Sequence, residues 1–108
     1  MNFKLTHNSL RVKLSLEELK DLRDGLDLEE CLTFPDRDFA LCVSAGYDTP
    51  DYLATFDGDK IALVVPNQAL LALEEMGRSK DGVGGQCGGL DIAVQVDIRK
   101  DSRNRRQH

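Results

Sequence analysis

The sequence has no tryptophan, and only 6% of its residues are aromatic. A core built from it must be aliphatic, and an aromatic platform for stacking single-stranded nucleic acid is not expected. It also lacks an apolar run of signal-peptide or membrane-spanning length, so we expect no membrane partner and a cytoplasmic location. The three cysteines, Cys31, Cys42 and Cys87, show no metal-ligand spacing. No metal site is therefore predicted. No other cofactor is predicted either.

Charge is unevenly distributed along the 108 residues. Five of the 14 Lys and Arg residues lie in 99–108, but only one of the 19 Asp and Glu residues does. Residues 1–98 therefore have a net charge of −9, and residues 99–108 have a net charge of +4. We interpret 1–98 as a single α+β domain and 99–108 as a basic, flexible tail. An acidic body repels phosphate backbones, which makes nucleic acid an unlikely partner.

Apolar and polar residues alternate in segments 2–6 and 9–14, as they do in strands with one buried face. A two-residue turn at His7-Asn8 would pair Leu5 with Leu10 and Phe3 with Val12. The opposite face would then carry Asn2, Lys4, Arg11 and Lys13.

Two short helices are predicted. Ser15 and Glu18 have the spacing of a capping box, which predicts a helix over about 16–24 that ends at Gly25. Pro66 precedes a second apolar helical stripe over about 67–76.

The remaining strands are predicted in two further hairpins and one C-terminal segment. A turn over 35–38 between 28–34 and 39–45 would place Cys31 opposite Cys42. A turn at Gly58-Asp59 between 51–57 and 60–65 would pair Phe56 with Ile61, Ala54 with Leu63 and Tyr52 with Val65. Residues 78–89 are interpreted as a glycine-rich loop, and residues 90–98 alternate as a final strand.

These elements predict about seven mostly antiparallel strands and two helices in the order ββα-ββ-ββα-β. We expect one curved sheet or a partly open barrel. The segments Val12-Lys13-Leu14-Ser15 and Leu63-Val64-Val65-Pro66 both lead into a helix. This correspondence is compatible with an internal ββαβ duplication.

The sequence resembles a family of small bacterial proteins of unknown function. The matching residues are Asn8-Ser9-Leu10-Arg11, Glu29-Glu30, Phe56, Gly58, Ile61, Val65-Pro66 and Leu90 to Asp97. The resemblance implies the same α+β fold and implies no catalytic activity.

Two sets of residues are candidate sites. Cys31 and Cys42 would form a cross-strand thiol pair, either redox-sensitive or simply two reduced small apolar residues. The second set is a basic contact surface that would engage an acidic partner, or is a solvated strand face with a loose tail. It consists of Lys4, Arg11, Lys13, Arg99, Lys100, Arg103, Arg105 and Arg106.

No nucleophile, base and orienting group are recognisable together, so the sequence leans away from an enzyme without settling the question. The favoured hypothesis is a non-enzymatic interaction module that binds a protein partner or a second copy of itself. One alternative is a small-molecule binder or enzyme with a pocket in a curved sheet, lined by Cys31, Cys42, Glu30, Thr33, Ser44 and Gln95. A further alternative is nucleic-acid association through the basic tail.

Overall fold

The computed structural model describes residues 1–76 and 82–96, which form eight strands and two helices. In chain order these elements are β1 (Asn2–Thr6), β2 (Ser9–Leu14), α1 (Leu16–Arg23), β3 (Leu28–Thr33), β4 (Asp38–Gly46), β5 (Leu53–Asp57), β6 (Lys60–Pro66), α2 (Asn67–Met76), β7 (Val83–Cys87) and β8 (Leu90–Val96). The α+β class and the two helices agree with the sequence-based prediction. The basic tail and the end of the predicted last strand lie outside the described residues.

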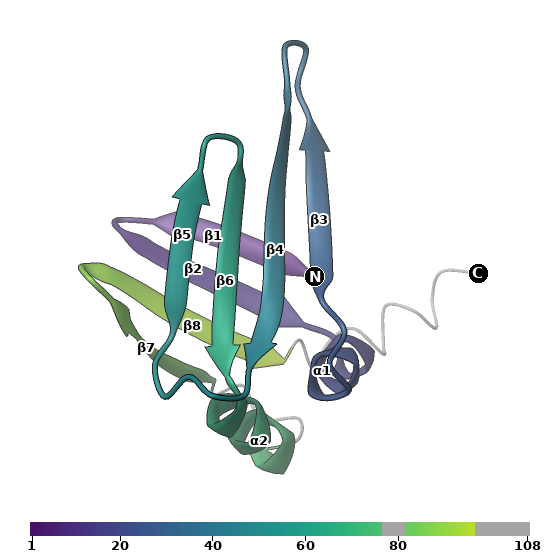
Figure 1. Ribbon diagram of the computed structural model, residues 1–108, viewed down its shortest axis with the longest axis vertical. Coiled ribbons are helices and arrows are strands. Elements are labelled where there is room, and N and C mark those ends of the chain that lie inside the picture. The colour runs from purple at the N-terminus through teal and green to yellow at the C-terminus, as the bar shows by residue number, and fades with distance from the viewer. Residues whose placement is uncertain (77–81, 97–108) are drawn as a thin grey trace.

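The strands form two four-stranded sheets that pack face to face. The first sheet has the order β1-β2-β8-β7, and the second has the order β3-β4-β6-β5. Each sheet joins two antiparallel hairpins through a parallel central pair, β2 with β8 and β4 with β6. The strands of the first sheet cross behind those of the second (Figure 1). The predicted single curved sheet or barrel is therefore wrong, because the first and last hairpins form one sheet, the two middle hairpins form another, and neither sheet closes on itself.

Two of the three predicted hairpin registers are confirmed. Leu5 pairs with Leu10 and Phe3 with Val12 around His7 and Asn8, which adopt φ values of 45° and 63°. Positive φ at both turn residues matches the right-handed twist of the flanking strands. The β5–β6 hairpin likewise pairs Phe56 with Ile61, although β5 begins at Leu53 and leaves Tyr52 outside the ladder.

The predicted register of the β3–β4 hairpin is wrong by two residues. The turn is Phe34–Arg37, closed by a 2.8 Å hydrogen bond from Phe34 N to Arg37 O. Pro35 is thus the second residue of the turn, the position that its fixed φ favours. As a result Cys31 lies opposite Ala40, and Cys42 lies opposite Glu29.

The predicted glycine-rich loop contains a strand that the sequence did not reveal, β7. Glycine normally weakens a strand, but it is used where another group approaches the backbone closely. A Cβ at Gly84 would lie 2.7 Å from the Ile92 carbonyl oxygen, and one at Gly85 would lie 2.7 Å from the Tyr52 ring. These glycines are therefore explained by packing within β7 and against Tyr52.

Both helices lie at one end of the second sheet (Figure 1). The predicted capping box of α1 is present: Glu18 N donates to Ser15 Oγ at 3.1 Å, and Ser15 N donates to Glu18 Oε1 at 2.9 Å. Arg23 connects the helices, with its Nη1 3.2 Å from Asn67 Oδ1 and its Nε 3.4 Å from Glu74 Oε1. The helices thereby close this end of the core.

The buried core repeats at a fixed interval. Among residues 1–76 and 82–96, twelve of the fifteen buried side chains form six pairs that are each 51 residues apart. The pairs are Val12 and Leu63, Leu14 and Val65, Leu19 and Leu70, Leu22 and Leu73, Leu41 and Ile92, and Val43 and Val94. The repeating unit is ββαββ, with β1–β4 and α1 matching β5–β8 and α2. This unit is one strand longer than the ββαβ unit predicted from sequence. The predicted repeat did not include the segment of β4 in either half, and it contained no strand at β7.

Candidate functional site

The outer face of the first sheet places three basic side chains on adjacent positions of β1 and β2. Lys4 on β1 pairs directly with Arg11 on β2, and Lys13 pairs with Asn2. The alternation of these strands turns Leu10, Val12 and Leu14 into the core, which forces Arg11 and Lys13 outward. The sequence-based assignment of Lys4, Arg11 and Lys13 to one face is thus what the strand register produces.

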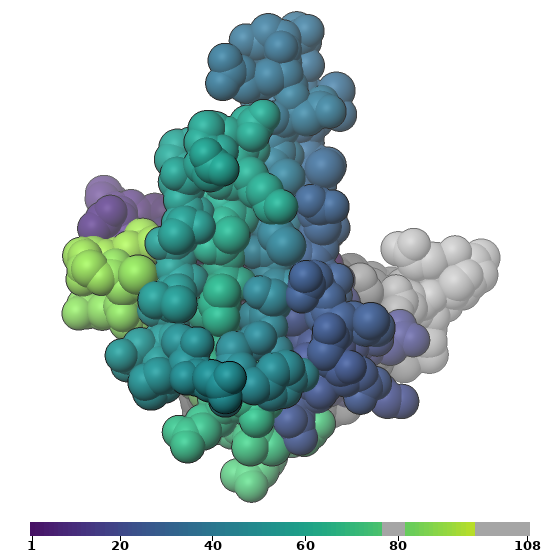
Figure 2. Space-filling model, viewed as in Figure 1, coloured from purple at the N-terminus to yellow at the C-terminus, as the bar shows by residue number. Residues whose placement is uncertain are grey.

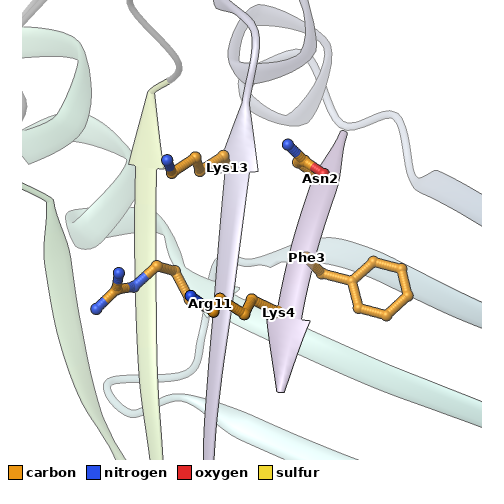
Figure 3. A pocket seen from close by; sticks show the side chains of 5 residues that line it. All are labelled: Asn2, Phe3, Lys4, Arg11 and Lys13. Atoms are coloured by element: carbon orange, nitrogen blue, oxygen red, sulfur yellow. The ribbon is translucent and has the colours of Figure 1, made fainter. Parts of the chain in front are cut away.

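Small residues on the neighbouring strands leave room beside Arg11. In the same row of the sheet, Arg11 is followed by Ala93 on β8, which pairs with Gly84 on β7. The Arg11 side chain consequently extends across β8, and Lys13 extends in the same direction (Figure 3). This arrangement could not be predicted from sequence, because it depends on the parallel pairing of two segments about 80 residues apart.

A shallow hollow of about 270 Å³ lies at this surface. It is lined by Asn2, Phe3, Lys4, Arg11 and Lys13. The ring of Phe3 points away from Lys4 and Arg11 (Figure 3). The groups exposed in the hollow are therefore cationic side chains and one amide, and the aromatic ring is not among them. We call the outer-face residues Asn2, Lys4, Arg11 and Lys13 the basic face.

The positive charge of the basic face is not neutralised within residues 1–76 and 82–96. No carboxylate in these ranges lies within 4.0 Å of the Lys4, Arg11 or Lys13 nitrogen atoms. The one carboxylate that the described strands place on this side of the sheet is Asp91, whose Oδ1 accepts a 2.6 Å hydrogen bond from Gln86 Nε2. Three cations against one carboxylate make this surface exceptional in a body whose net charge is −9.

The equivalent face of the second sheet has a different character. The positions 51 residues after Lys4, Arg11 and Lys13 are Thr55, Ala62 and Val64, none of which is charged. The outer face there continues with Ala40, Cys42 and Ser44 on β4. The two halves thus share their core but differ in what they present to solvent.

The predicted thiol pair does not have the predicted geometry. Cys31 and Cys42 share the outer face of the second sheet, but the register sets Ala40, not Cys42, opposite Cys31. Both are free cysteines, as is Cys87. Burial raises the pKa of the Cys42 thiol; Lys60 lowers it, and Asp27 and Glu29 raise it further, so the net shift is upward. A raised pKa lowers the thiolate fraction and hence the reactivity of Cys42.

The residues proposed for a small-molecule pocket do not meet. Cys31, Thr33, Cys42 and Ser44 lie on the outer face of the second sheet, and Gln95 lies on the outer face of the first. Glu30 lies on the inner face of β3, with its Oε1 3.6 Å from the Met1 amine. Where the sheets face each other, a cluster of buried apolar side chains fills the space instead of a ligand cavity formed by these six residues.

Two further findings concern only the described parts of the chain. None of the helices there is long and apolar enough to cross a membrane. Within the same residues, no three His, Cys, Asp or Glu side chains come together in a group that could hold a metal ion.

A family model for a family of unknown function, DUF7009, matches residues 1–102, and the chain belongs to this family. The resemblance to an uncharacterised family is thereby confirmed. Neither a curated protein nor a solved structure gives a significant match.

Proposed function

We propose that this member of DUF7009 is a non-enzymatic protein-interaction module whose basic face binds an acidic segment of a protein partner. This proposal rests on one observation. Lys4, Arg11 and Lys13 cluster on one sheet face, and none of them has a carboxylate partner among the described residues. Adjacent like charges are unfavourable, so an anionic ligand at this face would relieve their repulsion as well as form ion pairs.

The internal repeat strengthens this proposal. We infer that one ββαββ unit was duplicated, because the core positions recur at 51 residues and both central strand pairs keep the same register. Packing constrains the repeated core in the same way in both halves, but it does not constrain the outer faces. Only one of the two outer faces carries the three cations, which the shared fold does not require.

The form of the surface favours a protein segment over the alternative ligands. The described strands place no aromatic side chain on the outer face of the first sheet, so single-stranded nucleic acid would lack a stacking platform. The hollow of about 270 Å³ is shallow and slightly below the usual size of a small-molecule pocket, roughly 300–1,000 Å³. An extended acidic segment could instead lie along the row of cations. Three free thiols fit a reducing cytoplasmic setting for this interaction.

Fluorescence anisotropy with a labelled Asp/Glu-rich peptide tests the proposal. Arg11→Glu/Lys13→Glu should weaken binding by at least about tenfold. The control Lys20→Glu/Lys60→Glu, with the same charge change at two exposed lysines elsewhere, should retain most of the affinity. Equal losses in both variants would mean that only net charge matters.

A poly-dT oligonucleotide is measured in parallel to separate protein from nucleic-acid binding. We expect no binding to it at low salt. Binding that disappears when residues 99–108 are deleted would instead favour the nucleic-acid alternative.

A further inference from the structure

The crossed packing of the two sheets leaves one end of the second sheet uncovered. The hairpin ends of β3–β4 and β5–β6 extend past β1, the nearest strand of the first sheet (Figure 1). The β3–β4 end projects clearly from the body of the molecule (Figure 2). Leu32, Phe34, Phe39 and Phe56 lie at this end, and we call them the apolar overhang.

Three of the four side chains of the apolar overhang are exposed, Phe39 is half-buried, and all four lie outside the core. Leu32 is 50% exposed, Phe34 is 49% exposed and Phe56 is 68% exposed. Phe39 and Phe56 contact each other edge to face, with ring centroids 6.3 Å apart and planes at 64°. Neither belongs to the buried cluster or to the partly buried residues packed against it.

The exposed apolar area of the overhang is comparable to that of patches that bind partners. From the areas typical of large side chains, these residues expose roughly 300 Å² of apolar surface. The largest apolar patches on monomeric proteins measure about 300–600 Å² and often mark binding sites. Three of the four Phe residues in the chain are gathered here.

The repeat shows that the fold does not require this patch. The position equivalent to Phe56 in the first sheet is Leu5, and the position equivalent to Phe39 is Leu90, each 51 residues away. Leu90 and the neighbouring Cys87 pack against the core, so Leu5 is the one strongly exposed apolar side chain of that hairpin end among the described residues. The aromatic cluster is thus particular to the second sheet.

The charges around the overhang indicate what it would bind. The two turns carry Asp36, Asp38, Asp57 and Asp59 against Arg37 and Lys60, and all six are exposed. The two turns therefore have a net charge of −2. The Glu30 carboxylate, on the inner face beside Leu32, is already paired with the Met1 amine at 3.6 Å. Two copies meeting at this patch would bring their acidic turns together, which disfavours self-association.

We propose that the apolar overhang binds a partner segment in which large apolar side chains are flanked by Lys or Arg. The apolar side chains would cover Leu32 and the three phenylalanines, and the flanking cations would face the turn carboxylates. This surface lies on the other sheet from the basic face and requires the opposite charge in its ligand. The inference is therefore independent of the proposed function.

The test is a selection from a random peptide library displayed on phage, with the folded full-length chain as bait. Wild type should enrich peptides that combine aromatic or large aliphatic residues with net positive charge. Phe34→Ser/Phe56→Ser should lose this class, and the best peptide should bind it at least about tenfold more weakly. Leu5→Ser, which removes a comparably exposed apolar side chain from the first sheet, should retain both properties.

A second variant tests the charge requirement. Asp38→Asn/Asp59→Asn should still enrich apolar peptides but should lose the preference for Lys and Arg. Circular dichroism establishes that each variant is folded before selection. Failure of wild type to enrich the positively charged apolar class would overturn the proposal, as would its persistence in Phe34→Ser/Phe56→Ser or its equal loss in Leu5→Ser.

Sedimentation velocity decides between a foreign segment and a second copy. We expect a monomer for wild type. A dimer that Phe34→Ser/Phe56→Ser dissociates would show that a second copy occupies the overhang, and the proposal would be wrong. Acidic peptides enriched through Arg11 and Lys13 report on the basic face, so failure at either surface can be recognised separately.

Discussion

The ring of Tyr52 packs directly on the backbone of Gly85, joining the segment before β5 to the inner face of β7. A Cβ at Gly85 would lie 2.7 Å from Tyr52 Cδ1 and 3.0 Å from Cε1. Tyr52 is only 7% exposed, and burial raises the pKa of its hydroxyl. This contact connects the two sheets and explains a glycine that the sequence alone assigned to a loop.

Substituting Gly85 should therefore destabilise the protein. We expect Gly85→Ala to lower the free energy of unfolding by about 1–3 kcal/mol, because the added methyl group overpacks the site. The control is Gly89→Ala, whose Cβ would approach only Asn8 Nδ2, at 3.6 Å. Urea denaturation measures both variants. In a double-mutant cycle with Tyr52→Leu, the effects should be less than additive; strict additivity would contradict a direct contact.

The Glu18 carboxylate should make stability depend on pH. Burial alone would raise the pKa of Glu18, but hydrogen bonds from the Met1 amine and Ser15, with the charge of that amine, lower it below 4.5. A lowered folded-state pKa stabilises the fold above the unfolded-state pKa. This contribution is lost as the pH falls through the folded-state pKa.

Glu18→Gln should therefore reduce the free energy of unfolding near neutral pH by about 1 kcal/mol. The deficit should shrink as the medium is made acidic enough to protonate Glu18 in the wild type. Glu17→Gln, in the same first turn of α1, is the matched control and should change stability less. Urea unfolding across this pH range measures the difference, and a deficit independent of pH would contradict the ion pair.

The β3–β4 register can be tested with cysteines. Because Ala40 lies opposite Cys31, Ala40→Cys/Cys42→Ser should form an intramolecular disulfide under mild oxidation. The wild type should retain three reactive thiols when assayed in denaturant after the same treatment. Peptide mapping identifies any cross-link. A Cys31–Cys42 disulfide in the wild type, without one in the variant, would favour the register that the sequence suggested.

Local signals in the sequence predicted much of the fold. Alternation over 2–6 and 9–14, the Ser15–Glu18 capping box and the turn at Gly58-Asp59 depend on neighbouring residues, and each was confirmed. The predicted β3–β4 turn begins one residue too late, at Pro35, because proline marks a turn without showing whether it is the first or the second turn residue; the turn begins at Phe34. β7 was missed because the reason for its glycines lies in Ile92 and Tyr52, which are distant in sequence.

The candidate site was predicted only in part, for the same physical reason. Strand alternation placed Lys4, Arg11 and Lys13 on one face, and the structure brings them together. The small neighbours Ala93 and Gly84 arise from the parallel pairing of β2 with β8, which no local pattern encodes. The apolar overhang was not foreseen, because its exposure results from the crossing of two sheets where one was expected (Figure 1).

Amide NMR spectra recorded during titration with an Asp/Glu-rich peptide test the central claim most directly. We predict chemical-shift changes centred on Lys4, Arg11, Lys13 and Ala93, reduced by added salt and absent in Arg11→Glu/Lys13→Glu. The same variant should keep the fold of wild type, because both side chains lie on the outer face. Shift changes centred on another surface, or unchanged binding by the variant, would contradict the assignment of the basic face as the interaction site.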